Sequence, residues 1–220
     1  MNSKKQRSIQ PPELPRQLGS TWPTEGLQDE GEYVNLKVTN ESLANQAATQ
    51  VRLKSVWFKQ TALGAMRLIS PQLSNLRLEN CDLANTIWET ATVRRVVING
   101  CRMTGFKAIE AHLQDVVFQE CIGTLAQFRY AKFKAVRFEK CNLANADFQG
   151  ADLSGVQFVQ CDLTNVEMSH TTLRGADFRS SKIEGLKVGA QELPGAIVNH
   201  FQAVYLATLL GIIVKDEYED

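Results

Sequence analysis

Residues 141–187 read CNLANADFQGADLSGVQFVQCDLTNVEMSHTTLRGADFRSSKIEGLK, and every fifth residue from Leu143 onward is large and apolar. A small or narrow residue, such as Cys141 or Ala146, stands two positions before most of them. A helix repeats near 3.6 residues and a strand repeats at 2, so neither explains a period of five. The chain must therefore coil with a longer repeat.

The period extends from Tyr33 to Val188, and only Ala48, Ala108 and Gly123 interrupt the large apolar positions. We expect a large neighbour, Trp88, to compensate for Ala108, and a local bulge or flattened corner at Gly123. The cysteines set the length of one coil, because all five are spaced by 20 residues: Cys81, Cys101, Cys121, Cys141 and Cys161. Four five-residue sides then make one coil. This predicts an all-β solenoid of about eight square coils over residues 31–188, stacked at ~4.8 Å with ladders of inward side chains.

Several units share the pattern Ala-Asp-Leu/Phe, among them Ala146-Asp147-Phe148, Ala151-Asp152-Leu153 and Ala176-Asp177-Phe178. This pattern resembles that of the pentapeptide-repeat proteins. The resemblance implies a right-handed quadrilateral β-helix, in which the Asp before the large residue contacts the backbone at a corner.

Composition favours a cytoplasmic protein without a membrane span. Lys plus Arg equals Asp plus Glu at 24 each, so no overall charge attracts nucleic acid or anionic lipid. No stretch approaches the ~18 apolar residues that a membrane span needs. The odd number of cysteines argues against a disulfide framework and favours a ladder of buried, reduced thiols. A zinc site is the alternative, but the spacings typical of such sites are absent.

Both ends of the chain differ from the repeat. Residues 1–30 are rich in proline and predict a flexible arm, from which Trp22 and Leu27 would cover the first coil, with Leu14 to Trp22 as part of that cover. Residues 189–220 predict a capping helix over His200 to Leu210, begun by a capping box of Asn199 and Gln202 and ended by Gly211. A short strand over Ile212 to Val214 and an acidic tail over Asp216 to Asp220 would follow.

The apolar residues of this helix spread too widely around it for a single contact face. We therefore expect a homodimer through the C-terminal end, with four residues in its interface: Phe201, Tyr205, Leu206 and Leu209. The alternative is a helix folded fully onto the last coil.

No catalytic or cofactor motif is present, and His112, His170 and His200 belong to none. We expect no enzyme activity, cofactor or metal.

Residues 31–188 contain 19 basic and 15 acidic residues. On the predicted coils, some of the basic residues form one strip, flanked by Lys132: Lys54, Arg77, Arg94, Arg95, Lys134, Arg137 and Arg174. This strip is either an ordinary solvated surface or a docking site for an acidic partner.

Two functions follow. The first is a non-catalytic scaffold that binds another protein, whose identity the sequence does not give. The second comes from the resemblance, because some pentapeptide-repeat proteins resemble DNA and bind gyrase, protecting it from quinolones. A DNA mimic should be strongly acidic, whereas this rod is mildly basic, so the scaffold is favoured. Direct binding to nucleic acid is not expected.

Overall fold

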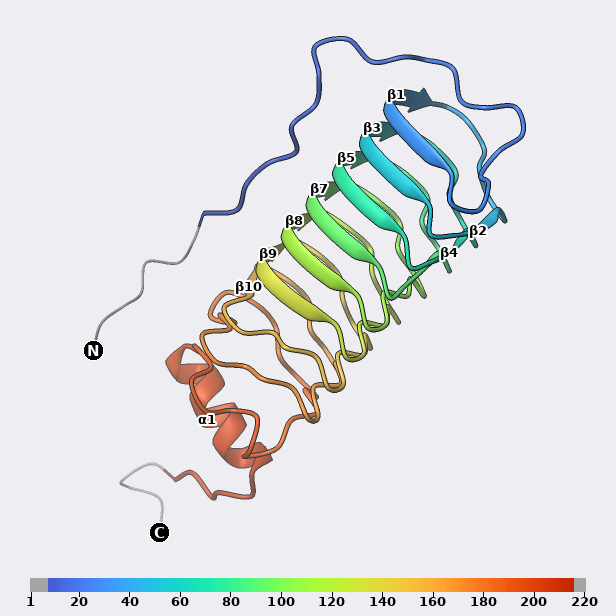
Figure 1. The fold of residues 1–220 in the computed structure, drawn as a ribbon. Coiled ribbons are helices and arrows are strands. Elements are labelled where there is room, and N and C mark those ends of the chain that lie inside the picture. The colour runs from blue at the N-terminus through green and yellow to red at the C-terminus, as the bar shows by residue number, and fades with distance from the viewer. Residues whose placement is uncertain (1–7, 216–220) are drawn as a thin grey trace.

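The computed structural model describes residues 8–215 as a parallel β-solenoid closed by one helix (Figure 1). One sheet contains seven strands in the order β1-β3-β5-β7-β8-β9-β10, and a second contains β2-β4-β6. The strands of the first sheet are β1 (Glu32–Thr39), β3 (Arg52–Lys59), β5 (Gln72–Glu79), β7 (Thr92–Asn99), β8 (His112–Gln119), β9 (Lys132–Glu139) and β10 (Gln157–Val159). Those of the second are β2 (Ala47–Thr49), β4 (Arg67–Ile69) and β6 (Ile87–Glu89).

The register confirms the 20-residue coil. Tyr33 of β1 pairs with Leu53 of β3, and this offset of 20 recurs in every strand pair. Full eight-residue strands define six turns, fewer than the eight coils expected from the sequence. Beyond β9 the same offset continues through β10 and isolated bridges as far as Asp177 with Ile197, because these coils pair at single residues rather than along whole strands.

Each corner of the coil is a residue in the left-handed backbone region. Every fifth residue from Glu30 to Gly175 has a positive φ, between 50° and 74°. Asn and Gly adopt this conformation most readily, and they occupy many of these positions. The Asp before the large residue caps the turn, since Oδ1 of Asp147 accepts a 2.9 Å hydrogen bond from the Gln149 N–H.

The inward side chains form the ladders that the sequence predicts. Phe118 stacks on Phe138 with ring centroids 4.6 Å apart, and Phe158 continues the same ladder. Phe128 and Phe148 stack in a second ladder at 4.9 Å. These rings are fully buried and fill the centre of the later coils.

The prediction of a bulge at Gly123 was wrong. The Gly123 N–H donates to the Asn142 carbonyl at 2.7 Å, and Ile122 keeps its bridges to the coils on both sides. A Cβ at residue 123 would lie 2.9 Å from Cδ2 of Leu143, so the Leu143 side chain occupies the space that a larger residue would need.

The core volume that the small Ala108 side chain leaves open is filled by a residue on the same side of the coil as well as by Trp88. Phe106 occupies the position that is normally small, and its ring packs against Trp88 with centroids 5.1 Å apart. Both rings are buried, so the missing volume at Ala108 is filled without a change in the backbone.

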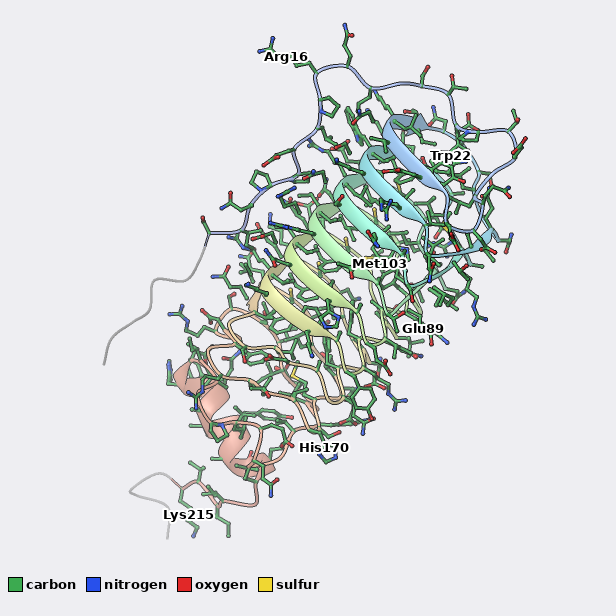
Figure 2. The ribbon with its side chains drawn as sticks, viewed as in Figure 1. Arg16, Trp22, Glu89, Met103, His170 and Lys215 are labelled. Atoms are coloured by element: carbon green, nitrogen blue, oxygen red, sulfur yellow. The ribbon has the colours of Figure 1, made fainter. Side chains whose placement is uncertain are left out.

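The N-terminal segment is not a free arm in the part that the structure describes. It runs along the outside of the rod toward the β1 end (Figure 1). Gly19 then pairs with Leu36, Trp22 stacks on Tyr33 at 5.0 Å, and Leu27 is buried, which confirms Trp22 and Leu27 as covers of the first coil. Figure 2 shows Trp22 at this end of the rod. Backbone groups of residues 8–18 find partners on the rod.

The C-terminal helix α1 (His200–Leu209) closes the opposite end. The capping box is present as predicted, with the Gln202 N–H donating to Oδ1 of Asn199 at 2.9 Å and the Asn199 N–H donating to Oε1 of Gln202 at 3.0 Å. Gly211 has φ +83° and ends the helix. Ile212 to Val214 form no strand and are exposed. The predicted acidic tail lies outside the described residues.

Candidate partner-docking face

The basic residues predicted as a strip lie on the long strands, in columns along the rod. Lys54, Arg94 and Lys134 occupy one exposed column on β3, β7 and β9, where Ser74 and Gln114 separate them. Arg174 continues the column beyond the strands, since its carbonyl accepts from the Gly155 N–H at 3.0 Å. No ion pair within residues 8–215 involves any of these four cations. Their charges are therefore available to a partner.

A second column holds Arg77 and Arg137, and each is partly neutralised by its own strand. Nε of Arg77 lies 2.5 Å from Oε1 of Glu79, and Nη1 of Arg137 lies 3.4 Å from Oε2 of Glu139. The Lys37 Nζ in this column lies 4.5 Å from the centre of the Trp57 ring, an attractive cation–π contact. This side of the strip thus carries less free positive charge than the Lys54 column.

Arg95 lies between the two columns, on the bend at the middle of each long strand. The bend residues form what we call the central column: Asn35, Ser55, Asn75, Arg95 and Asp115. Arg95 donates from Nε to Oδ1 of Asn75 at 2.7 Å. The structure therefore brings the predicted strip together as two columns with Arg95 between them.

Residues 8–18, which we call the strap, cover this central column. Glu13 donates its backbone N–H to Oδ1 of Asn75 at 3.1 Å and accepts at its carbonyl from Oγ of Ser55 at 3.4 Å. The Gln10 N–H donates to Oδ1 of Asp115 at 3.3 Å. Ser55, Asn75 and Asp115 are buried, although they point outward from the coil.

Sequence reasoning missed the strap as part of this face. Ser55, Asn75 and Asp115 carry no distinctive signal, because short polar residues also occupy exposed corners such as Asn85 and Asn145. Such residues supply acceptors and donors for a second backbone. Without the structure, however, nothing in the sequence pointed to the chain's own N-terminal segment as that backbone.

The predicted dimer residues divide into two pairs. Phe201 and Leu209 are exposed, and Phe201 retains 74% of its accessible surface. Leu206 is buried, and the half-buried Tyr205 accepts a hydrogen bond from the Gly185 N–H, so this pair packs against the last coils of the same chain. Other exposed apolar residues, which the sequence analysis did not assign, lie within or near α1 in the chain: Ile197, Val204, Leu210, Ile212, Ile213 and Val214.

The remaining candidates for chemistry are scattered. His112, His170 and His200 are exposed and belong to different elements. In residues 8–215 no group of three or more His, Cys, Asp or Glu side chains is arranged to hold a metal ion. The cysteines are free and buried in one ladder. Over the same part of the chain, no helix has the length and apolar character needed to cross a membrane.

Comparison with known proteins adds a family assignment for the rod. Residues 94–159 and 131–196 each match a family model described as a pentapeptide repeat region. Comparison with curated proteins gives no match.

Solved structures with similar folds include three pentapeptide-repeat or resistance proteins. Trypsin-treated QnrB1, a plasmid-mediated fluoroquinolone resistance protein, is 14% identical with a TM-score of 0.45, over 84% of this chain and 100% of that chain. HetL of the cyanobacterium Nostoc sp. strain PCC 7120, involved in heterocyst differentiation regulation, is 18% identical with a TM-score of 0.24, over 73% and 91%. Rfr23 of the cyanobacterium Cyanothece 51142 is 10% identical with a TM-score of 0.22, over 78% and 91%. These scores carry no argument about function.

Proposed function

This chain is a pentapeptide-repeat protein, and from that premise we propose that it is a cytoplasmic, non-catalytic scaffold that docks an acidic segment of a partner protein on its basic strip. One observation carries the proposal: Lys54, Arg94 and Lys134 are exposed, aligned along one edge of the rod and free of ion pairs within the described residues. A rigid array of like charges attracts an oppositely charged partner and fixes its register.

The rod suits a scaffold because its shape is set by a continuous core. Its backbone groups are paired from coil to coil, so the spacing of the three cations depends on the whole ladder rather than on one loop. Lys54 and Arg94 are two coils apart, as are Arg94 and Lys134, which places the charges at intervals of ~9.6 Å. An extended acidic peptide can present carboxylates at such intervals.

The test is binding of a fluorescein-labelled peptide with the sequence (Glu-Pro-Glu)₄, measured by fluorescence anisotropy. The triple variant Lys54→Glu, Arg94→Glu, Lys134→Glu should lose binding, and binding to the native chain should weaken as salt rises. A matched control changes net charge equally on another side of the rod: Arg67→Glu, Lys107→Glu, Lys187→Glu. Equal loss in both variants would show attraction by net charge alone and would overturn the docking strip.

We also propose that two copies pair through the C-terminal end. The exposed apolar residues Phe201, Leu209 and Ile213 lie on or just after α1, and apolar surface of this kind is typical of an interface between subunits. Tyr205 and Leu206 pack against the last coils while Phe201 and Leu209 stay exposed, which supports a helix that contacts its own rod through one part of its surface and a second copy through another.

A gyrase-directed role is the alternative, and the charges on the rod do not favour it. A protein that replaces DNA should present rows of acidic side chains, whereas the aligned exposed column here is basic. Titration of this protein into a DNA supercoiling assay with purified gyrase, with and without a quinolone, separates the two functions. The scaffold predicts no effect at micromolar protein, and dose-dependent inhibition or protection would favour the alternative.

A further inference from the structure

The strap lies over the central column, between the two basic columns. It is held there by backbone groups: the N–H groups of Gln10 and Glu13 donate to Asp115 and Asn75, and the Glu13 carbonyl accepts from Ser55. Backbone groups are common to all peptides, so these contacts select an extended conformation rather than a particular sequence. Another peptide could therefore make the same three hydrogen bonds.

The spacing of the acceptors matches a polyproline II helix. Asn75 and Asp115 are two coils apart along the rod, ~9.6 Å at the β-sheet spacing. One turn of a polyproline II helix spans three residues at 3.1 Å each, about 9.3 Å. Gln10 and Glu13 are three residues apart, and Pro11 and Pro12 between them favour this helix. The central column is thus commensurate with a polyproline II peptide.

The strap gains little from the charge of its surroundings. Residues 8–18 contain one basic residue, Arg16, and one acidic residue, Glu13, so the strap carries no net charge. The columns on either side of the strap contain Lys54, Arg94 and Lys134, and Lys37, Arg77 and Arg137. A strap without net charge is attracted weakly by these cations, so an acidic peptide would interact more favourably with the same surface.

We propose that residues 8–18 are a displaceable strap over a peptide-binding surface, and that an extended acidic segment of the partner binds in their place as a polyproline II helix. This inference rests on the proposed docking function and adds its regulation. The strap and the partner compete, so the apparent affinity of the partner is its intrinsic affinity multiplied by the fraction of molecules with the strap released.

The experiment releases the strap without altering the surface beneath it. The double variant Gln10→Pro, Glu13→Pro removes both N–H donors and remains compatible with the polyproline II conformation. Loss of two hydrogen bonds should raise affinity for the labelled (Glu-Pro-Glu)₄ peptide about tenfold. Gln17→Pro is the matched control, because Gln17 is exposed and its N–H has no acceptor among residues 8–215. Glu13→Gln controls for the lost charge, and neither control should reproduce the gain.

The outcomes separate this inference from the function on which it rests. If the native chain binds the peptide through Lys54, Arg94 and Lys134 but the release variant binds no tighter, the docking function stands and the strap is overturned. If neither chain binds the peptide, the docking function is overturned. If the release variant binds a twelve-residue oligothymidine as tightly as the peptide, the surface attracts any polyanion, and the proposal of a site specific for peptides is overturned.

Discussion

The Tyr205 hydroxyl accepts a 2.6 Å hydrogen bond from the backbone N–H of Gly185, a residue of the last coils. Gln202 reinforces this junction, since its Nε2 donates to the carbonyls of Phe178 and Ser181 at 2.8 Å each. Leu206 is buried beside them. One side of α1 therefore satisfies the open end of the solenoid, where backbone groups would otherwise lack partners.

Tyr205→Phe should destabilise the protein by roughly 1–3 kcal/mol, because it leaves the partly buried Gly185 N–H without its acceptor. Urea unfolding followed by circular dichroism measures the change. Thr208→Val is a suitable control, since its hydroxyl bonds only within α1 and is exposed. Equal midpoints for Tyr205→Phe and the native protein would mean that the hydroxyl does not anchor the helix.

The double variant Phe201→Asp, Ile213→Asp should convert the proposed dimer to a folded monomer. These side chains are 74% and 83% exposed, so the change leaves the melting temperature of the monomer almost unaltered. Sedimentation velocity at several concentrations reports the mass. A dimer that survives the double change would exclude this end as the interface.

Phe148→Ala should cost about 3–5 kcal/mol, because Phe148 is fully buried and stacks on Phe128 in the ladder. Phe148→Asp should prevent folding, since it would bury an unpaired charge among aromatic rings. Glu184→Ala, an exposed change nearly two coils further along, provides the comparison. Thermal melts of the three variants test the inward position of residue 148, and an unchanged melting temperature for Phe148→Asp would contradict the assigned coil.

Acid should destabilise the later coils through two turn carboxylates. Hydrogen bonds from the Thr164 hydroxyl and N–H lower the pKa of Asp162, and the Arg179 guanidinium beside Asp177 lowers the pKa of that carboxyl. A pKa lower in the folded than in the unfolded state stabilises the protein above the unfolded value, near 3.9, and this contribution disappears as pH falls through the folded value.

Asp162→Asn and Asp177→Asn should therefore be less stable than the native protein at pH 6, with the difference shrinking as the pH falls below about 4. Urea midpoints measured at intervals between these values give the two curves. Parallel curves for variant and native protein would show that neither carboxylate contributes through its ionisation.

The coils could be predicted from the sequence because the inward positions recur at a fixed spacing along the chain. The period of five at Leu143, Phe148 and Leu153 and the 20-residue spacing of the cysteines determine which side chains point inward and how many residues make one turn. The capping box at Asn199 and Gln202 was also predictable, since it depends on residues three positions apart. The way in which the core is filled beside Gly123 was not predictable, because it depends on the position of the Leu143 side chain in the next coil.

The candidate face was only half predictable. Lys54, Arg94 and Lys134 follow from the coil length alone, and the structure aligns them as expected. The strap could not be predicted. Its Glu13 N–H donates to Asn75, 62 residues away, and a backbone N–H is present in almost every residue, so the sequence does not indicate which one is used. The inward pair Tyr205 and Leu206 was missed for a related reason, because the rotation of α1 is set by its contacts with the last coils.

The thiols of the cysteine ladder should not react with thiol reagents in the folded protein. Each thiol has at most 3% of its residue surface exposed, so a reagent in solution does not reach it while the protein is folded. Ellman's reagent at pH 8 should therefore find no reactive thiol in the native protein and all five in guanidinium chloride. Rapid reaction of one native thiol would place that cysteine outside the core, and a higher melting temperature on addition of zinc would favour the metal site over the reduced ladder.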